Sequence, residues 1–177
     1  SVGKIFLILL CYHLLLFRHF YFQNPYVYAR SEALEQAFSS WIHLGCCLRG
    51  HHPVADPYYY PDYAALPFLS TYYPPHRLTA WLGTFLSLDN AWKLYGLTMV
   101  LHFLWSSLAV WSILQSFLPA LPALFGAVTL SSMGYAMKQN SCIVYTLAWI
   151  PIWLLASQRH ITTLSGISLG MMLLAGY

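Results

Sequence analysis

The amino-acid sequence predicts an all-α, polytopic integral membrane protein with about five transmembrane helices. Composition is the first reason. Of 177 residues, 59% are hydrophobic and only 7% are charged, whereas about 25% are charged in an ordinary soluble domain. So few charges cannot cover a soluble surface, while lipid accepts apolar surface directly. The second reason is that long apolar runs alternate with polar or proline-containing stretches, which is typical of repeated membrane crossings.

A first transmembrane helix is predicted within residues 1–22, where the apolar run IFLILLCYHLLLF follows Lys4. A secretory signal would need small residues for cleavage, and RHFYFQ stands at that place instead. Residues 23–93 are polar and rich in proline and tyrosine, so prolines interrupt any single helix there. We expect this region to be a long extracytoplasmic loop that carries short interfacial helices.

Transmembrane helices two to five are predicted in residues 94–177. Residues 94–117 carry no formal charge over a length that can cross about 30 Å of hydrocarbon. The third span is expected to end near Met137, and the fourth is SCIVYTLAWIPIWLLAS. The fifth begins at Ile161 and is unfinished at Tyr177, so we expect an N-terminal fragment of a larger membrane protein.

Residues 31–49 are predicted to form an amphipathic helix within the loop. At 100° per residue, one side collects apolar residues and the other collects polar ones. The apolar side holds Leu34, Ala37, Phe38, Trp41, Gly45 and Leu48. We expect this side to lie in the lipid boundary and the polar side to face water or a cavity. The stretch from Arg77 to Asp89 is expected to form a second short interfacial helix.

The carboxylates of the chain are confined to this loop. All five fall between residues 32 and 89, and they are Glu32, Glu35, Asp56, Asp62 and Asp89. Any acid, base or cation chemistry of this chain is therefore expected at one membrane face. Acidic residues at a helix start also have an ordinary explanation, because they favour the positive end of the helix dipole.

Five short motifs follow one another along the chain: Glu32 with Gln36, PVADPY from Pro53 to Tyr58, Tyr73-Pro74, Leu101-His102, and Trp149-Ile150-Pro151. In these motifs and their order, the chain resembles the YfhO-like family of bacterial multi-spanning membrane proteins, which belongs to the GT-C type of glycosyltransferases. The resemblance runs from about Arg30 to Arg159. Glu32 stands where the family usually has Asp, and Asp56 where it has Asn, so Glu35 stays open as the functional acid.

The resemblance implies transfer of a sugar from a polyprenyl-phosphate carrier to an acceptor at the outer face of the bacterial cytoplasmic membrane. Glu32 is the implied catalytic base and Glu35 is the second choice. The implied substrate-binding residues are Gln36, Asp56, Tyr58, Tyr73, His76, Arg77, His102 and Lys138. Asp56 would hold a divalent cation, the one candidate cofactor, or would hydrogen-bond the acceptor.

Three of these residues, His76, Arg77 and Lys138, are candidates for the carrier phosphate because they lie at predicted membrane boundaries. Contact with lipid headgroups is their alternative role. For the whole chain, the alternatives are a non-catalytic membrane scaffold or transport subunit, and a bis-histidine haem protein that uses His13 and His102. Nucleic acid is excluded as a partner because the net charge is only +3 and no basic cluster with interleaved aromatic residues is present. The lipid bilayer and the lipid-linked donor are the expected partners.

Overall fold

The computed structural model describes residues 2–18, 32–50, 72–131 and 141–175. Within these ranges the chain forms seven helices and no strand. The helices are α1 (Val2–Leu16), α4 (Glu32–Leu48), α5 (Pro74–Gly83), α6 (Leu88–Leu114), α7 (Ala120–Ser131), α9 (Ser141–Gln158) and α10 (Thr162–Ala175). The prediction of an all-α protein is confirmed for this part of the chain.

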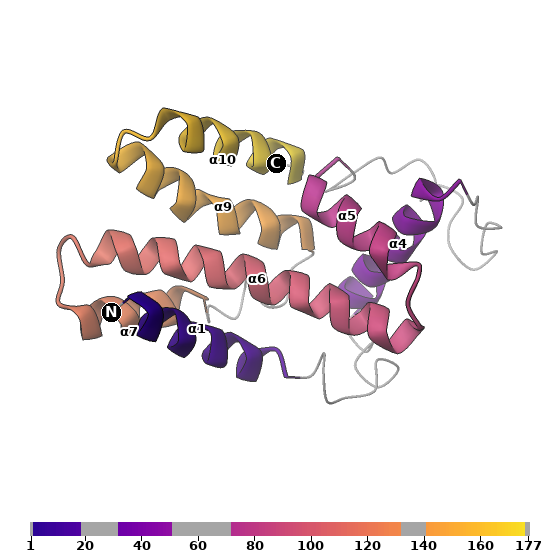
Figure 1. The fold of residues 1–177 in the computed structure, drawn as a ribbon, viewed down its shortest axis with the longest axis horizontal. Helices are drawn as coiled ribbons and strands as arrows, with labels where there is room; N and C mark the ends of the chain where they lie inside the picture. The colour runs from indigo at the N-terminus through magenta and orange to yellow at the C-terminus, as the bar shows by residue number, and fades with distance from the viewer. Residues whose placement is uncertain (1, 19–31, 51–71, 132–140, 176–177) are drawn as a thin grey trace.

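Helix α6 is the centre of the fold. It has 27 residues and packs against α1, α5, α7 and α9, while α10 packs on α9 and α4 packs on α5 (Figure 1). In Figure 1, α9 lies along one side of α6 with α10 beyond it, α1 and α7 lie along the other side, and α4 and α5 form a separate layer near the N-terminal end of α6. The fold therefore consists of a helical bundle and a two-helix layer at one end of it.

Among the described helices, only α6 is long and apolar enough to cross a membrane, judged by length and composition. Three further apolar helices are shorter, namely Val2–Leu16, Ala120–Leu130 and Thr162–Ala175, whereas a spanning helix needs about 20 residues. Helix α6 indicates association with a membrane, and the prediction of five spans is not confirmed.

The observed helix boundaries differ from the predicted ones at two places. Helix α6 begins at Leu88, whereas the second span was expected from residue 94, so the loop region ends earlier than predicted. Helix α5 covers Pro74–Gly83 instead of the predicted 77–89. It begins earlier because Pro74 and Pro75 occupy its first two positions, where a missing backbone N–H has no cost.

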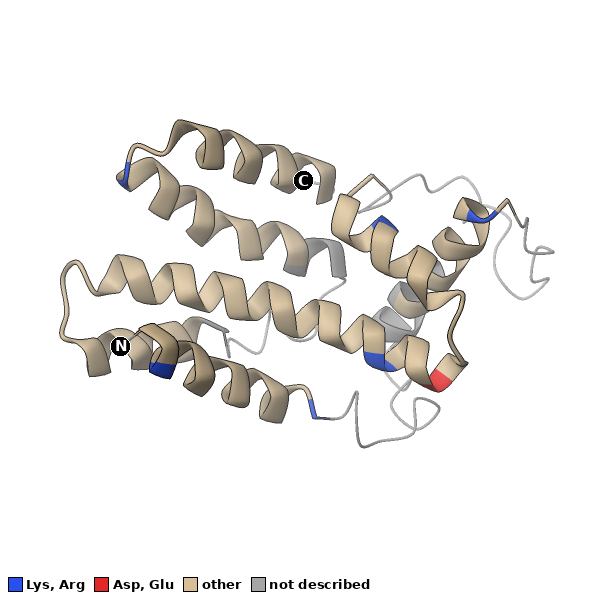
Figure 2. Ribbon diagram, viewed as in Figure 1, with Lys and Arg blue, Asp and Glu red and all other residues tan. Residues whose placement is uncertain are grey.

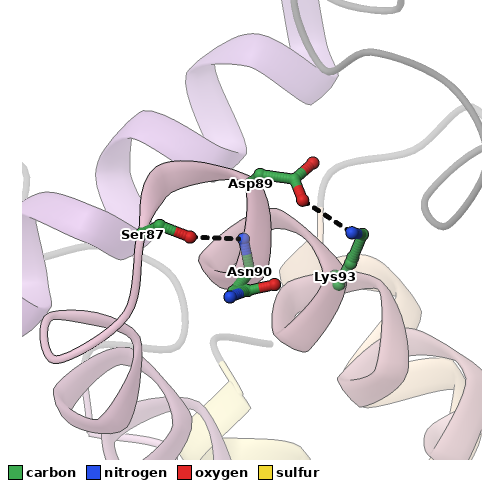
Figure 3. A network of polar contacts seen from close by, with 4 residues as sticks. All are labelled: Ser87, Asp89, Asn90 and Lys93. Carbon is green, nitrogen blue, oxygen red and sulfur yellow. Dashed lines mark hydrogen bonds and ion pairs between the residues drawn. The ribbon is translucent and has the colours of Figure 1, made fainter.

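The start of α6 carries a capped and paired first turn (Figure 3). The Ser87 side chain accepts a hydrogen bond from the Asn90 backbone N–H at 3.4 Å. The Lys93 ammonium donates to the Asp89 carboxylate at 2.6 Å, one helical turn away. Ser is a favoured N-cap, and an acid in the first turn complements the helix dipole. These local interactions explain why the helix extends N-terminally beyond the uncharged run.

The core is aromatic where the two-helix layer meets the bundle. Its largest fully buried side chains come from α4, α6, α9 and the residue before α5: Trp41, Tyr73, Trp92, Tyr95 and Tyr145. Phe38 of α4 meets Trp92 of α6 edge to face, with ring centroids 4.9 Å apart. A second, smaller core lies between α6 and α7. The contact between α1 and α6 includes a buried hydrogen bond between His13 Nε2 and Ser107 Oγ at 2.9 Å.

The outside of the bundle is apolar and its charges lie toward the ends. Large hydrophobic side chains are exposed on α1, α5, α6, α7, α9 and α10, and they include Leu7, Leu101, Trp105, Phe125 and Leu173. Figure 2 shows the described charges near the two ends of the bundle, with uncharged helix between them. Lys4 at the start of α1 and Arg159 after α9 belong to one end. The other described charges lie shortly after α1 (Arg18), just after α4 (Arg49), on α5 (Arg77) and at the start of α6 (Asp89 and Lys93).

Candidate functional site

The Tyr73 hydroxyl joins three parts of the fold. Tyr73 is the N-cap residue of α5, His102 lies in α6, and Trp149 lies in α9. The Tyr73 Oη atom is 2.5 Å from His102 Nε2 and 2.7 Å from Trp149 Nε1. His76 and Tyr145 complete the group, and these five residues are called the Tyr73 cluster below.

The hydrogen bonds of the Tyr73 cluster have a single consistent direction. His102 Nδ1 lies 2.6 Å from the Thr98 carbonyl oxygen, which can only accept, so Nδ1 carries the proton. Nε2 of the neutral imidazole is then an acceptor, and the Tyr73 hydroxyl donates to it. The indole N–H of Trp149 can only donate, so it donates to the Tyr73 oxygen. The chain from Trp149 through Tyr73 and His102 to Thr98 satisfies every group in it.

Tyr145 packs against the other members of the cluster. Its ring centroid lies 4.3 Å from that of His102 and 5.1 Å from that of Tyr73. Its hydroxyl lies 3.3 Å from His76 Nδ1. Tyr145 and Trp149 are four residues apart, so they share the face of α9 that meets α6. This spacing lets one helix contribute both a stacking ring and a hydrogen-bond donor.

Two titratable groups of the cluster outside α6, His76 and Tyr73, are uncharged at neutral pH. Burial, with an additional contribution from the neighbouring His102, lowers the pKa of His76 to about 3. Burial also raises the pKa of Tyr73 well above its ordinary value, although the hydrogen bond from Trp149 acts in the opposite direction. Neither group exchanges a proton near pH 7. The cluster is therefore suited to holding helices in position.

The local sequence places Tyr73 at this junction. The residue before a proline favours extended backbone, and Tyr73 adopts φ −71° and ψ 113° directly before Pro74. Its side chain is fully buried, whereas the neighbouring Tyr72 is 63% exposed. The chain thus enters α5 through one anchored tyrosine.

Helix α4 is held tightly on α5. Trp41 Nε1 donates to Thr79 Oγ1 at 3.3 Å. A Cβ atom on Gly45 would lie 2.3 Å from the Ala80 carbonyl oxygen, and one on Gly83 would lie 2.4 Å from the Trp41 ring. Trp41 and Gly45 are buried by these contacts, so the prediction that they lie in the lipid boundary is wrong. Trp41 and Gly45 pack on protein because two glycines, Gly45 and Gly83, allow the close crossing.

The structure brings together some of the predicted substrate-binding residues. Tyr73 and His102 are hydrogen-bonded to each other. His76 lies buried in the same cluster, and its contact with a carrier phosphate stays a prediction. Arg77 is half-buried on α5, and it remains a candidate for the phosphate.

The other predicted site residues lie partly or wholly outside the described part of the structure. Glu32, Glu35 and Gln36 lie in the first two turns of α4, and their side chains lie outside the described part. The remaining three, Asp56, Tyr58 and Lys138, lie outside the described residues altogether. Asp89, the described carboxylate, is exposed and paired with Lys93.

Metal and haem ligation depend on donor side chains that are grouped together and free to bind. Within the described ranges, no three His, Cys, Asp or Glu side chains are grouped so that they could hold a metal ion. Both ring nitrogens of His102 are engaged, one by Thr98 and one by Tyr73. An axial haem ligand needs a free ring nitrogen, so His102 does not fit the bis-histidine interpretation.

Sequence reasoning missed Tyr145. It belongs to none of the five motifs, and the only signal was its position four residues before Trp149 on a predicted helix. Comparisons with protein-family models, with curated proteins and with solved structures found no match. The function of the Tyr73 cluster therefore follows from its geometry and from the sequence motifs that contain its residues.

Proposed function

We propose that this protein is a multi-spanning membrane glycosyltransferase that moves a sugar from a polyprenyl-phosphate carrier to an acceptor at the outer face of the bacterial cytoplasmic membrane. One observation supports this more than any other. Three motif residues of the YfhO-like resemblance, Tyr73, His102 and Trp149, meet in one hydrogen-bond chain. His102 lies 29 positions and Trp149 lies 76 positions after Tyr73 in the sequence. Separate chance matches in sequence have no reason to converge in space.

The membrane setting is supported by the surface of the bundle. Helix α6 lies at the centre, yet only 44% of the residues in its most apolar window are buried, whereas a core helix of a soluble protein is buried nearly all round. Large apolar side chains also cover α1, α7 and α10. Lipid accepts such a surface without cost, and the segregation of charges toward the ends supports a setting in which the middle of the bundle lies in hydrocarbon.

In the proposed reaction, a carboxylate of α4 acts as the base. Glu32 is the first choice and Glu35 the second. The carboxylate removes the proton from the acceptor hydroxyl, the acceptor oxygen bonds to the anomeric carbon, and the bond from that carbon to the carrier phosphate breaks, which inverts the sugar centre. A positioned base contributes typically about 10²- to 10⁴-fold.

The role of the Tyr73 cluster is to position this base. Helix α4 is held on α5 through Trp41 and Gly45, and α5 is held on α6 and α9 through Tyr73. A base must lie within about 3 Å of the proton that it takes, so its supporting helices must not shift. A neutral network that is hydrogen-bonded throughout provides such support without competing for the proton.

Single and double replacement of the two acids tests the proposal. In the full chain, Glu32→Gln, Glu35→Gln and the double variant are assayed for sugar transfer from synthetic lipid-linked donors. Loss of the true base should lower turnover by about 10²- to 10⁴-fold. Asp89→Asn is the matched control, because Asp89 is an exposed carboxylate paired with Lys93 and should leave turnover unchanged. Full turnover in the double variant, with transfer readily detected in the parent, would remove these carboxylates as the base.

A non-catalytic membrane scaffold is the second candidate function. It is favoured by the neutral, fully hydrogen-bonded character of the Tyr73 cluster, which is what a purely structural junction requires. A scaffold predicts no transfer from any lipid-linked donor by the parent protein. The same assay therefore distinguishes the two functions.

A further inference from the structure

Helix α5 and the turn after it present an apolar side away from the protein. The residues that face inward are small or part of the Tyr73 cluster, namely His76, Ala80 and Gly83. The exposed apolar residues are Leu78, Trp81, Leu82, Phe85 and Leu86. At 100° per residue, positions 78, 81 and 82 lie opposite positions 76, 80 and 83. A helix at a protein–water surface has the reverse arrangement, with its polar side outward.

An aromatic pair and a cation form the rim of this apolar side. The rings of Trp81 and Phe85 meet edge to face, with centroids 5.0 Å apart. The Arg49 guanidinium lies 4.5 Å from the Phe85 ring centroid and donates to the Thr84 carbonyl oxygen at 3.2 Å. Tryptophan is enriched at the level of lipid headgroups, and an arginine held at the rim of an apolar surface matches a phosphate-bearing layer.

The position of α5 in the fold agrees with a location at the level of the lipid headgroups. The α4–α5 layer lies at the N-terminal end of α6, where the Asp89–Lys93 ion pair marks the start of polar surroundings (Figures 1 and 2). On the apolar side of α4, Trp41 and Gly45 are covered by α5, and Phe38 packs on Trp92 of α6. The outward side of α5 is exposed instead, so it is a surface of this layer that lipid can reach.

We propose that the outward side of α5, from Leu78 to Leu86, docks into the headgroup–acyl boundary of a bilayer leaflet, with Arg49 in contact with anionic headgroups. This inference rests on the proposed membrane setting of the bundle. It agrees with the interfacial helix that the sequence predicts at Arg77–Asp89, and it adds which residues of that segment meet lipid and which cation meets the headgroups. Docking would hold the α4–α5 layer at the depth where a lipid-linked donor carries its phosphate.

Depth-dependent fluorescence quenching tests the docking. The full chain is reconstituted into phosphatidylcholine vesicles that contain lipid brominated either near the headgroup or near the bilayer centre. The Trp81 signal is the difference between the parent protein and Trp81→Phe. Helices in the boundary lie about 5–10 Å deep, so bromine near the headgroup should quench this signal about twofold more than bromine near the bilayer centre.

Two further tryptophans act as depth controls. Trp105 is exposed on the middle of α6, and its signal should be quenched more by bromine near the bilayer centre. Trp92 is buried, and its signal should respond to neither lipid. If Trp105 responds but Trp81 is quenched only by acrylamide in water, the docking of α5 is wrong and the membrane setting stands. If Trp81 is shielded from both probes, protein covers α5 and the docking is also wrong. No response of Trp105 would overturn the membrane setting itself.

The headgroup contact is tested separately. Brominated phosphatidylglycerol should quench Trp81 about twofold more strongly than brominated phosphatidylcholine at equal fraction, because the Arg49 charge enriches anionic lipid beside it. Arg49→Gln should remove this preference. Arg159→Gln, at the opposite end of the bundle, should leave it intact. An unchanged preference in Arg49→Gln would contradict the assigned role of Arg49.

Discussion

Replacing Tyr73 by Phe removes the hydroxyl that links α5 to both α6 and α9. Trp149 Nε1 then loses its acceptor and His102 Nε2 loses its donor. Each buried polar group left unpaired costs about 1–3 kcal/mol. Because His102 and Trp149 are only partly buried, the lower part of that range applies, and we expect the free energy of unfolding to fall by about 2–3 kcal/mol. Far-UV circular dichroism during SDS titration of protein in dodecyl maltoside micelles measures the change.

The neighbouring tyrosine provides a matched control. Tyr72→Phe makes the same chemical change on a side chain that is 63% exposed, and its effect should stay within about 0.5 kcal/mol. A double-mutant cycle of Tyr73→Phe with Trp149→Phe should give a coupling energy of roughly 0.6 to 1.7 kcal/mol. Strictly additive effects, or equal losses for the two tyrosines, would refute the hydrogen-bond chain.

Two other changes probe the packing of α4 and the burial of the cluster. Gly45→Ala should lower the free energy of unfolding by about 1–3 kcal/mol, because the new Cβ atom would meet the Ala80 carbonyl oxygen. Gly166→Ala is the control in the same SDS titration, because Gly166 has open space around it. Similar losses for both would contradict the close helix crossing. Burial, with a further contribution from His102, lowers the pKa of His76 from 6.5 to about 3, so the unfolded state takes up a proton first as the pH falls. The contribution of neutral His76 to the free energy of unfolding is fully present above pH 6.5 and is lost as the pH falls toward 3. His76→Gln should flatten the fall in unfolding free energy between about pH 7 and about pH 5, and an unaltered slope would argue against this burial.

Local patterns predicted most helices well. The amphipathic period placed a helix at residues 31–49, and α4 covers Glu32–Leu48. The uncharged run from residue 94 identified α6, although the Ser87 cap and the Asp89–Lys93 pair extend it N-terminally. The lengths of the apolar runs predicted membrane spans less well than they predicted helices. Among the described helices, only α6 is long and apolar enough to cross a membrane.

The candidate site was predictable only in part. Tyr73 and His102 stood in motifs, but their mutual hydrogen bond could not be read from the sequence, since it depends on how α5 packs against α6. Tyr145 carried no motif, and its role comes from stacking on residues far away in the chain. The burial of His76 could not be read from the sequence either, because the sequence does not show which side of α5 is buried.

The sequence by itself determined that the chain is helical and apolar, where most helices lie, and that the acidic residues share one region. Hydropathy, proline positions and helical periodicity are local properties, so no fold is needed to read them. Only the tertiary structure decided which side of α4 and α5 meets protein, and which polar groups satisfy one another. Those outcomes depend on helices that are distant in sequence and on two glycines that let them approach, and burial by such neighbours decides whether a polar side chain acts as a ligand or as an anchor.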